Sequence, residues 1–418
     1  TGVDGYGPLQ GVRVIEVGNF IAGPFAGTLL AYYGAEVIKI EPPGGDQIRT
    51  FRDVDENGTG WWWRSIGRNK KSVVLDLKKK GAQDIVLQLC TGADVLLENF
   101  RPGKLESWNL GPLDVKKINE DIVYTRVSGY GQTGPYAPRP GFASACEAMG
   151  GFRYVNGFPD RPSVRPNLSI GDTLAGMNAA FGTVMALFAK EKGRGGQTVD
   201  SAIYESVFQL MEGVLCDYDG AGLIREPSGS TVTGIVPTNT YPTKDGKAVV
   251  IGSNSDALFK RLMNIMGRDD IANSDLYDSN QKRVKYQEFL DDTISEWCLQ
   301  RTASEVMQKV DKAAVPNGLI YSIEDIVKDP QYLAREMIEE VEVPALNRTL
   351  KIPGISPKLG STPGKTTWAG PELGFHSRQV FKDIMKMSDK QLLKHVDDGD
   401  ILWPQDDMDQ LDEIRHNL

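Results

Sequence analysis

Hydrophobic residues form short, almost unbroken runs within the first 130 residues of the chain. Such runs are typical of strands that are buried on both faces of a parallel sheet. The expected strands are 12–17, 35–41, 72–77, 94–100 and 122–127, and helical spacing at 24–33 and 80–91 separates them. Strands that alternate with helices predict right-handed crossovers. The pattern therefore predicts an α/β protein with a doubly wound, Rossmann-like sheet.

The predicted secondary structure and the composition change along the rest of the chain. The clearest helical pattern covers 172–190, and a second helix is expected from about 202 to 220. Residues 225–240 are rich in Pro, Ser, Gly and Thr and have the composition of a linker. A smaller α+β region follows through 334, with a strand at 248–252 and a helix at 256–266. Strands at 340–343 and 349–352, a loop at 353–374, a helix from about His376 and a solvated acidic tail after 396 complete the prediction.

The net charge of −9 argues against a general nucleic-acid or anionic-membrane binder. The four cysteines are too far apart in sequence for a zinc knuckle or a CxxC pair, and they suit a reducing compartment. No apolar run approaches the roughly 20 residues of a membrane-spanning helix. We therefore expect neither nucleic acid nor a membrane as a partner.

Histidine is confined to the last 43 residues, at His376, His395 and His416. A Ser–His or Cys–His pair in the body of the chain would need one of them folded back. A multi-histidine metal site would need most of them, so we expect no metal. If the protein is an enzyme, we expect carboxylates to carry the acid–base or nucleophilic chemistry.

Asp172 is the leading candidate, because it immediately precedes the strongest helical pattern and follows Gly171. As a helix N-cap, its carboxylate would accept backbone N–H groups. As a nucleophile, it would be kept ionised by the helix N-terminus, and Gly171 would let a substrate approach closely. The two roles are compatible.

Basic residues gather at the expected strand ends. Residues 61–80 carry a local excess of six positive charges, Lys39 ends another strand, and Arg101 and Lys104 follow a third. In a doubly wound sheet, ligands bind beyond the carboxyl ends of the strands, so this patch suits a phosphorylated ligand. The alternative is a solvated lysine face. The turn 18–24 lacks the GxGxxG pattern; it is either a phosphate-binding helix start or an ordinary βα turn.

Together these segments resemble the class III CoA-transferase family (CaiB/BaiF type), which also contains the α-methylacyl-CoA racemases. Each segment alone is weak evidence for the family, but the order and spacing of the segments are specific to it. The matching segments are 8–16 (PLQGVRVIE), 22–24 (AGP), 34–41 (GAEVIKIE), 68–72 (RNKKS), 94–102 (DVLLENFRP), 129–135 (GYGQTGP), 171–172 (GD) and 197–206 (QTVDSAIYES).

The resemblance implies a large α/β CoA-binding domain at 1–224 that is completed by 335–418. It also implies a linker with a small inserted α+β domain at 225–334, and an interlocked homodimer. Asp172 matches the family's catalytic aspartate, which forms an acyl anhydride and then an aspartyl-CoA thioester. CoA and its thioesters would be substrates, with no permanently bound cofactor. The compartment implied is the cytoplasm, or the mitochondrial matrix in a eukaryote.

The resemblance also assigns CoA contacts position by position. They are Asn19, Phe20, Ile21, Ala22, Lys39, Lys70, Lys71, Asn99, Phe100, Arg101 and Lys104. Lys70 and Lys71 are expected near the adenosine phosphate, and the backbone amides of 19–22 near the anionic intermediate.

Departures from the family pattern narrow the reaction. The histidine of the racemases is replaced by Phe142, which argues against racemisation, and Glu147 is a candidate for the missing supporting carboxylate. Residues 159–171 are most similar to the branch that moves CoA from succinyl-CoA to small dicarboxylates. Arg49, Arg64 and Arg165 are candidate partners of the second carboxylate. Formyl-CoA/oxalate transfer, acyl-CoA racemisation and CoA binding without catalysis are the alternatives.

Overall fold

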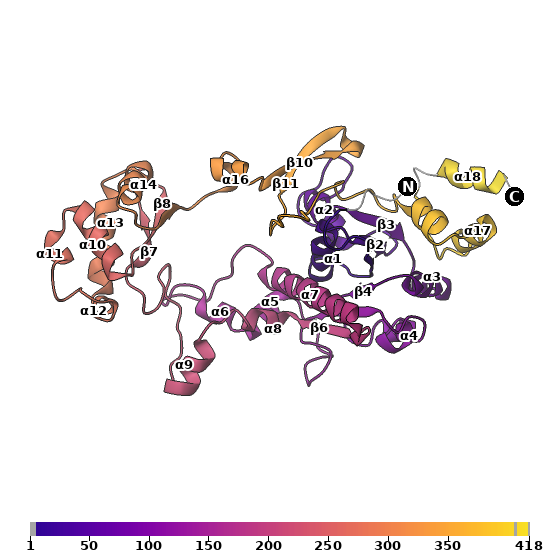
Figure 1. Cartoon of the computed structure of the whole chain (residues 1–418), viewed down its shortest axis with the longest axis horizontal. Helices are drawn as coiled ribbons and strands as arrows, with labels where there is room; N and C mark the ends of the chain where they lie inside the picture. The colour runs from indigo at the N-terminus through magenta and orange to yellow at the C-terminus, as the bar shows by residue number, and fades with distance from the viewer. Residues whose placement is uncertain (1–5, 405–407, 417–418) are drawn as a thin grey trace. The chain divides into compact units, whose positions relative to one another are not determined.

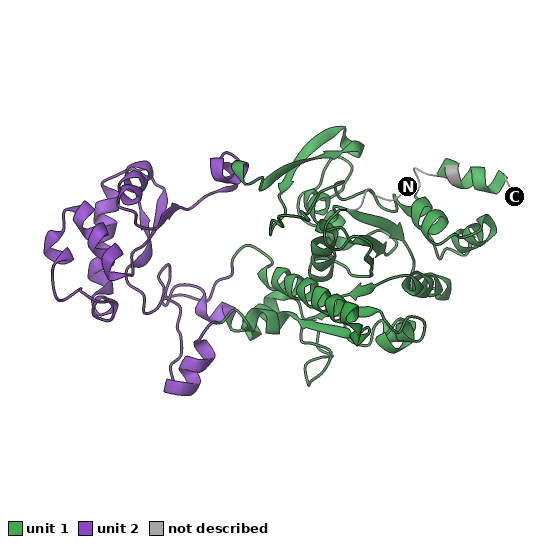
Figure 2. Ribbon diagram, in the orientation of Figure 1, with its two compact units in different colours: residues 1–151, 166–211, 334–418 green, residues 152–165, 212–333 purple. Residues whose placement is uncertain are grey.

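The computed structural model describes residues 6–404 and 408–416. The chain forms two compact units (Figure 2). The first contains the chain up to Gly151, then Pro166–Met211 and everything from Ala334 on, and the second contains Phe152–Arg165 and Glu212–Leu333. The second unit thus begins at Glu212 rather than at 225, and it includes a short segment that precedes Asp172.

The first unit is built on a six-stranded parallel sheet with the strand order β3-β2-β1-β4-β5-β6 (Figure 1). The strands are β1 (Arg13–Glu16), β2 (Glu36–Glu41), β3 (Lys70–Val74), β4 (Val95–Glu98), β5 (Val123–Ser128) and β6 (Thr198–Ala202). The predicted parallel α/β sheet is confirmed. The order reverses between β1 and β4, where doubly wound sheets bind their ligands. The sequence did not predict β6, whose TVDSA composition is mostly polar or small.

Helices cover both faces of this sheet. They are α1 (Ala22–Tyr32), α2 (Trp61–Ile66), α3 (Lys80–Thr91), α4 (Pro112–Lys116), α5 (Ala143–Met149), α7 (Ile170–Ala189), α8 (Ile203–Phe208), α17 (Asp389–Asp397) and α18 (Met408–His416). Single turns lie at η1 (Gln47–Thr50), η2 (Glu106–Trp108), η3 (Lys190–Arg194), η4 (Pro344–Leu346) and η5 (Gln379–Ile384). An antiparallel hairpin joins β10 (Ile338–Val343) to β11 (Arg348–Pro353).

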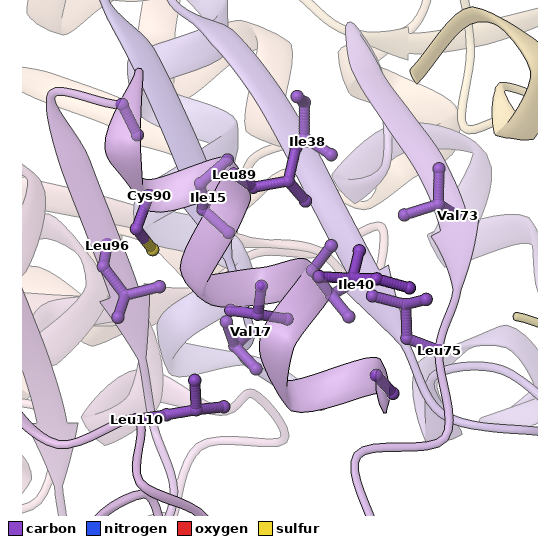
Figure 3. Packing of buried hydrophobic residues seen from close by; sticks show 14 of the residues in the cluster. Ile15, Val17, Ile38, Ile40, Val73, Leu75, Leu89, Cys90, Leu96 and Leu110 are labelled. Atoms are coloured by element: carbon purple, nitrogen blue, oxygen red, sulfur yellow. The ribbon is translucent and has the colours of Figure 1, made fainter. Parts of the chain in front are cut away.

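Alternate residues of each strand face opposite layers of core. Ile15 and Ile38 pack with α3 on one face (Figure 3), whereas Val14 and Val37 pack with α1 and α7 on the other. The α3 face is completed by residues from the distant C-terminal segment, among them Phe381. The first unit therefore cannot close its core without the part of the chain that follows the second unit.

The second unit has a hydrophobic core of its own. Its antiparallel strands are β7 (Thr238–Pro242), β8 (Ala248–Gly252) and β9 (Asn317–Leu319). Its helices are α6 (Phe152–Val155), α9 (Val214–Ala221), α10 (Asp256–Met266), α11 (Asp269–Ala272), α12 (Asn280–Val284), α13 (Gln287–Leu299), α14 (Ala303–Lys312), α15 (Ile323–Ile326) and α16 (Pro330–Ala334), the last of which ends at the return to the first unit. The strand at 248–252 and the helix at 256–266 match their predictions.

Two further sequence predictions are wrong. The helix expected from 202 to 220 is interrupted between Phe208 and Val214, so α8 and α9 fall in different units. The acidic tail is not simply solvated, because Leu411 of α18 is buried and Ile414 packs against the core of the first unit. Asp406 and Asp407 of that tail lie outside the described residues. Among the described helices, none is long and apolar enough to cross a bilayer.

Candidate active site

Asp172 lies in the first turn of α7 and is partly buried. The N-cap is Ser169, whose carbonyl accepts the N–H of Thr173 at 3.0 Å. The expectation that Asp172 is itself the N-cap is therefore wrong, because the helix begins at Ile170. A first-turn carboxylate still lies in the positive field of the helix N-terminus, which favours its charged form.

Glu147 supports the residue that precedes Asp172. Its side chain is fully buried in α5, and its Oε1 accepts the backbone N–H of Gly171 at 3.1 Å. A Cβ atom on Gly171 would lie 3.1 Å from Cγ of Glu147 and from Cγ2 of Ile203. Gly171 thus allows the close approach of α5, α7 and α8 beside Asp172.

The loop after β5 forms another wall of this region. A Cβ atom on Gly129 would lie 2.8 Å from Cα of Gly141, and one on Gly141 would lie 3.0 Å from Cα of Gly129, so the two backbones approach closely. The thiol of Cys146 donates to the carbonyl of Gly129 at 3.3 Å. Burial, with the negative charge of Asp172 acting in the same direction, raises the pKa of Cys146 to about 11. The thiol therefore stays protonated near the carboxylate of Asp172.

The β1–α1 turn is fastened to the end of β4 by two asparagines. Oδ1 of Asn99 accepts the N–H of Asn19 at 2.7 Å, and Nδ2 of Asn99 donates to the carbonyl of Asn19 at 2.7 Å. The amide of Phe20 donates to Oδ1 of Asn19 and to Oδ1 of Asp46. The expectation that these two amides stabilise an intermediate is thus wrong for this conformation, because both are already bonded. Ala22 and Gly23, at the start of α1, have no preceding carbonyl within their helix.

Helix α7 packs directly against the start of α1. A Cβ atom on Gly176 would lie only 2.7 Å from the carbonyl oxygen of Ala22. Asp172 and Gly176 are four residues apart on α7 and share a face, separated by about one helical pitch of 5.4 Å. The packing therefore places Asp172 about one turn from the β1–α1 turn.

Most of the predicted cations do not face solvent. Lys39 and Lys70 are fully buried and bind the two carboxylate oxygens of Glu16, each at 2.8 Å. Lys71 pairs with Glu36. Burial lowers the pKa of Lys70 to about 8, whereas for Lys39 the charges of Asp46 and Glu16 outweigh burial and raise the pKa.

The two predicted arginines of the first unit are also occupied. Arg49 makes a bidentate contact with Glu41, at 2.6 and 2.8 Å, and Arg64 pairs with Asp55 at 2.7 Å. Together with Lys71 they are almost completely buried. Roles for Lys39, Lys70, Lys71, Arg49 and Arg64 in direct ligand contact do not fit this structure, because their charges are already neutralised inside the protein.

The cations of the loop after β4 do remain exposed. Arg101 and Lys104 lie on the surface, and the Lys104 ammonium is 4.1 Å from the centroid of the Trp108 ring. Phe100 packs edge-on against Trp108, and its N–H donates to Glu98 at 2.7 Å. These residues follow β4 directly, next to Asn99. They therefore lie near the point between β1 and β4 at which the strand order reverses.

The remaining predicted positions are Ile21, Phe142 and Arg165. Ile21 is buried against Ile48 and Trp63, and Phe142 is 76% exposed immediately before α5. Arg165 is exposed at the end of segment 152–165 of the second unit. Asp46 is a residue that sequence reasoning missed. No local motif marks it, because the amide that it holds lies 26 positions earlier in the chain.

The histidines have other partners. Nδ1 of His376 accepts the N–H of Ser72 at 3.2 Å, and burial, together with Lys71, lowers the pKa of this ring to about 4. His395 pairs with Asp400 at 2.8 Å, and His416 bonds within α18. Across residues 6–404 and 408–416, no group of three His, Cys, Asp or Glu side chains is arranged to hold a metal ion.

A cavity of about 1200 Å³ in the first unit lies apart from Asp172. Strand β10, the two residues that follow it and the chain from Ile355 to His376 supply most of its lining, which also includes Arg64. None of the described residues of α7 or of the β1–α1 turn lines it. We therefore assign it no part in the candidate site.

Comparison with known proteins shows which proteins the chain is similar to. The chain is 44% identical to the succinyl-CoA–D-citramalate CoA-transferase of Chloroflexus aurantiacus, over 92% of this chain and 96% of that protein. It is 38% identical to the β subunit of the succinyl-CoA–L-malate CoA-transferase of the same organism, over 92% and 96%. A CaiB/BaiF family protein from Brucella suis has a similar structure, with a TM-score of 0.82 and 27% identity over 91% of this chain and 100% of that one.

The match to the family itself covers most of the chain. The model of CoA-transferase family III matches residues 9–377, which include the whole second unit, most of the first and every residue of the candidate site. Membership of this family accounts both for the order of the matching segments and for the parallel sheet that they build. The chain belongs to CoA-transferase family III and is a class III CoA-transferase.

Proposed function

We propose that the protein moves CoA from succinyl-CoA to a small dicarboxylate through covalent intermediates on Asp172. The observation that carries this proposal is the position of the Asp172 carboxylate. It lies in the first turn of α7, beside Gly171 and Glu147, and about one turn from the packing contact of Gly176 with Ala22. A carboxylate held ionised at a helix N-terminus can attack a thioester without a histidine base.

The reaction balances without any other reactant. An Asp172 oxygen attacks the succinyl thioester carbonyl, the C–S bond breaks, and a mixed anhydride and CoA thiolate result. The thiolate then attacks the aspartyl carbonyl, which releases succinate and leaves an aspartyl-CoA thioester. The acceptor carboxylate attacks this thioester and again forms an anhydride and CoA thiolate. Attack of the thiolate on the acceptor acyl carbon gives the new CoA ester and restores Asp172.

The names of the two relatives support the choice of substrates. Both name succinyl-CoA, and both name an acceptor that is a hydroxy-dicarboxylate. We propose an acceptor of that size and charge, in the range of citramalate, malate, itaconate or glutarate. Arg49 and Arg64 are neutralised inside the first unit, so we do not propose them as partners of its second carboxylate.

We also propose that the protein acts as a homodimer. Met177, Phe181, Met185 and Phe188 form an apolar stripe along α7, and each is at least half exposed. Contiguous apolar surface of this kind on a helix is typical of a protein–protein contact. Replacing Phe181 by Glu should shift the molecular mass in light scattering from that of a dimer to that of a monomer. An unchanged mass would contradict this interface.

The decisive experiment traps the intermediate. The protein is incubated with succinyl-CoA, with and without hydroxylamine, and the peptides are mapped by mass spectrometry. We expect an acyl or CoA adduct on the peptide that carries Asp172, and its conversion to a hydroxamate by hydroxylamine. An adduct on another peptide, or exchange without any adduct, would overturn the assignment.

Asp172→Asn provides the matching kinetic test, because it removes the charge and keeps the shape. We expect CoA exchange to fall by about 10³-fold or more, while CoA binding measured by calorimetry changes little. Asp114→Asn is the control, since Asp114 also lies in the first turn of a helix but in α4. Its exchange rate should equal that of the unmodified protein. A panel of citramalate, malate, itaconate, glutarate, oxalate and acetate then identifies the acceptor.

A further inference from the structure

One buried ammonium group ties three parts of the first unit together. Nζ of Lys39 contacts Oε1 of Glu16 at 2.8 Å, Oδ2 of Asp46 at 2.7 Å and the carbonyl of Gly18 at 2.9 Å. The contacts with Glu16 and Gly18 are hydrogen bonds, and the contact with Asp46 is a buried ion pair. Lys39 and Glu16 are also direct partners in the β1–β2 ladder. The position of the ammonium is therefore set by the sheet.

The other oxygen of Asp46 continues this connection to the backbone of the β1–α1 turn. Oδ1 of Asp46 accepts the N–H of Phe20 at 2.8 Å and that of Ile48 at 3.0 Å. Phe20 has a φ of 70°, in the left-handed region that a residue with a Cβ atom rarely adopts. Such a conformation persists only where the surroundings hold it. Here a charged carboxylate, itself paired with Lys39, bonds the amide of the strained residue.

The turn that this pair holds leads directly to α1, which packs against α7 at Gly176, about one turn from Asp172. Phe20 is followed by Ile21 and by Ala22, whose carbonyl meets Gly176 of α7. A change in the backbone at Phe20 would move the start of α1 and, with it, the surface one turn from the carboxylate of Asp172. Displacements of about 1 Å in such a region cost reaction rate on the order of 10²-fold without abolishing binding.

We propose that Lys39 and Asp46 are positioning residues for the transfer reaction. Their buried ion pair fixes the backbone of residues 18–22, and this turn holds the acyl-CoA thioester in line with Asp172. The inference rests on the proposed function. It gives Lys39 a role other than the CoA contact that its positive charge suggested. The charge of Lys39 acts on the protein's own backbone and carboxylates instead of on a phosphate group.

Three substitutions separate this role from a purely structural one. Asp46→Asn keeps the shape and an oxygen for the amide of Phe20 but removes the charge that pairs with Lys39. Asp46→Ala removes both. Lys39→Met keeps the length of the side chain and removes the ammonium. We expect kcat to fall about 10-fold for Asp46→Asn and about 100-fold for the other two, with KM for succinyl-CoA changed less than about 3-fold.

Arg68→Met is the matched control. Arg68 is a buried cation of the same unit, and it bonds Tyr32 Oη at 2.6 Å, at the opposite end of α1. This control should lower the midpoint of thermal unfolding as the Lys39 variant does, while its kcat stays within about 3-fold of the unmodified protein. Loss of kcat in all variants in proportion to their loss of stability would overturn the inference.

The rate of adduct formation keeps this test distinct from that of the proposed function. In a single turnover with succinyl-CoA, the unmodified protein should form the Asp172 adduct rapidly, and the Asp46→Asn variant should form it about 10-fold more slowly. If the unmodified protein forms no adduct, the proposed function fails. If both proteins form it at the same rate, the function stands and the positioning role is refuted. Asp46→Asn alone decides the outcome if Lys39→Met does not fold.

Discussion

The buried carboxylate of Glu147 accepts the backbone N–H of Gly171, the residue directly before Asp172. This bond joins α5 to the first turn of α7 and leaves Glu147 fully enclosed. In the proposed mechanism, the supporting carboxylate therefore acts through the backbone, at a position five residues after Phe142. A group that orients the proposed nucleophile in this way should affect both stability and rate.

Replacing Glu147 tests that relationship. Glu147→Gln retains an oxygen for Gly171, so we expect near-normal stability and a modest loss of kcat. Glu147→Ala leaves the amide of Gly171 without its partner, which should lower the free energy of unfolding by about 1–3 kcal/mol. It should also lower kcat more than Glu147→Gln does. Urea unfolding and steady-state kinetics measure the two effects. Glu205→Ala, on exposed α8 surface, is the control, and equal behaviour of Glu147→Ala and this control would contradict the role.

The exposed cations after β4 should contribute to CoA affinity alone. Arg101→Gln and Lys104→Gln are each expected to raise KM for succinyl-CoA about two- to five-fold, the size of an exposed ion pair, with kcat unchanged. The effect should weaken as salt is added. It should also disappear with succinyl-pantetheine, which lacks the nucleotide phosphates. Lys116→Gln, on exposed α4 surface, should have no effect with either thioester.

The contact between α7 and α1 predicts an unusual response to alanine. In most helix interiors Gly→Ala is stabilising by about 1 kcal/mol. At Gly176 the new methyl group would lie 2.7 Å from the carbonyl oxygen of Ala22, so the helices must separate. We expect Gly176→Ala to lower the free energy of unfolding by about 1–3 kcal/mol and to slow exchange.

Gly220 offers the comparison. It lies in α9, and a Cβ atom there would meet open space. Gly220→Ala should therefore follow the usual trend and leave the protein equally or more stable in urea. A Gly176→Ala variant that gained stability in the same way would show that α7 and α1 are not in close contact.

The buried ring of His376 should make the protein sensitive to mild acid. Burial, reinforced by Lys71, lowers its pKa to about 4, from an ordinary value of 6.5. Above pH 6.5 the ring is neutral in both states and the free energy of unfolding is unaffected. As the pH falls from 6.5 towards 4, the unfolded state binds a proton that the folded state does not. Stability should therefore fall by up to about 3 kcal/mol over that range.

His376→Gln removes this titration and keeps an acceptor for the N–H of Ser72. The urea midpoint of this variant should depend less on pH between 6.5 and 4 than that of the unmodified protein. His416→Gln, on α18, is the control and should retain the full dependence. If the urea midpoint depended equally on pH in all three proteins, His376 would be excluded as the cause of that dependence.

Hydrophobic patterning was sufficient to predict much of the first unit. Strands β1 to β5 and helix α7 lie within a few residues of their predicted places, because buried parallel strands and long packed helices have distinct apolar spacing. Strand β6 was missed because its packing depends on β5 and not on its own composition. The break between α8 and α9 was missed because no local signal marks the point at which the chain changes units.

The charged residues show where local sequence is insufficient. Residues 61–80 have a large positive excess, yet Lys70 and Arg64 are buried against Glu16 and Asp55. For Lys70 the partner lies in a different strand, more than 50 positions earlier. A local count of charge cannot detect such a partner. By contrast, Asp172 was identified as the leading carboxylate because its helix start is a local feature of the sequence.

The return of the chain to its first unit has a consequence during synthesis on the ribosome. Val380, Phe381 and Leu392 cover the same face of the sheet as Ile15 and Ile38, but they are translated only after all of residues 212–333. At 5–20 residues per second, the face of the nascent sheet that α3 covers thus stays incompletely covered for on the order of ten seconds. The inserted unit can fold in that interval around its own core. The nascent chain would then be a natural client for chaperones that bind exposed apolar strands, until its last segment leaves the exit tunnel.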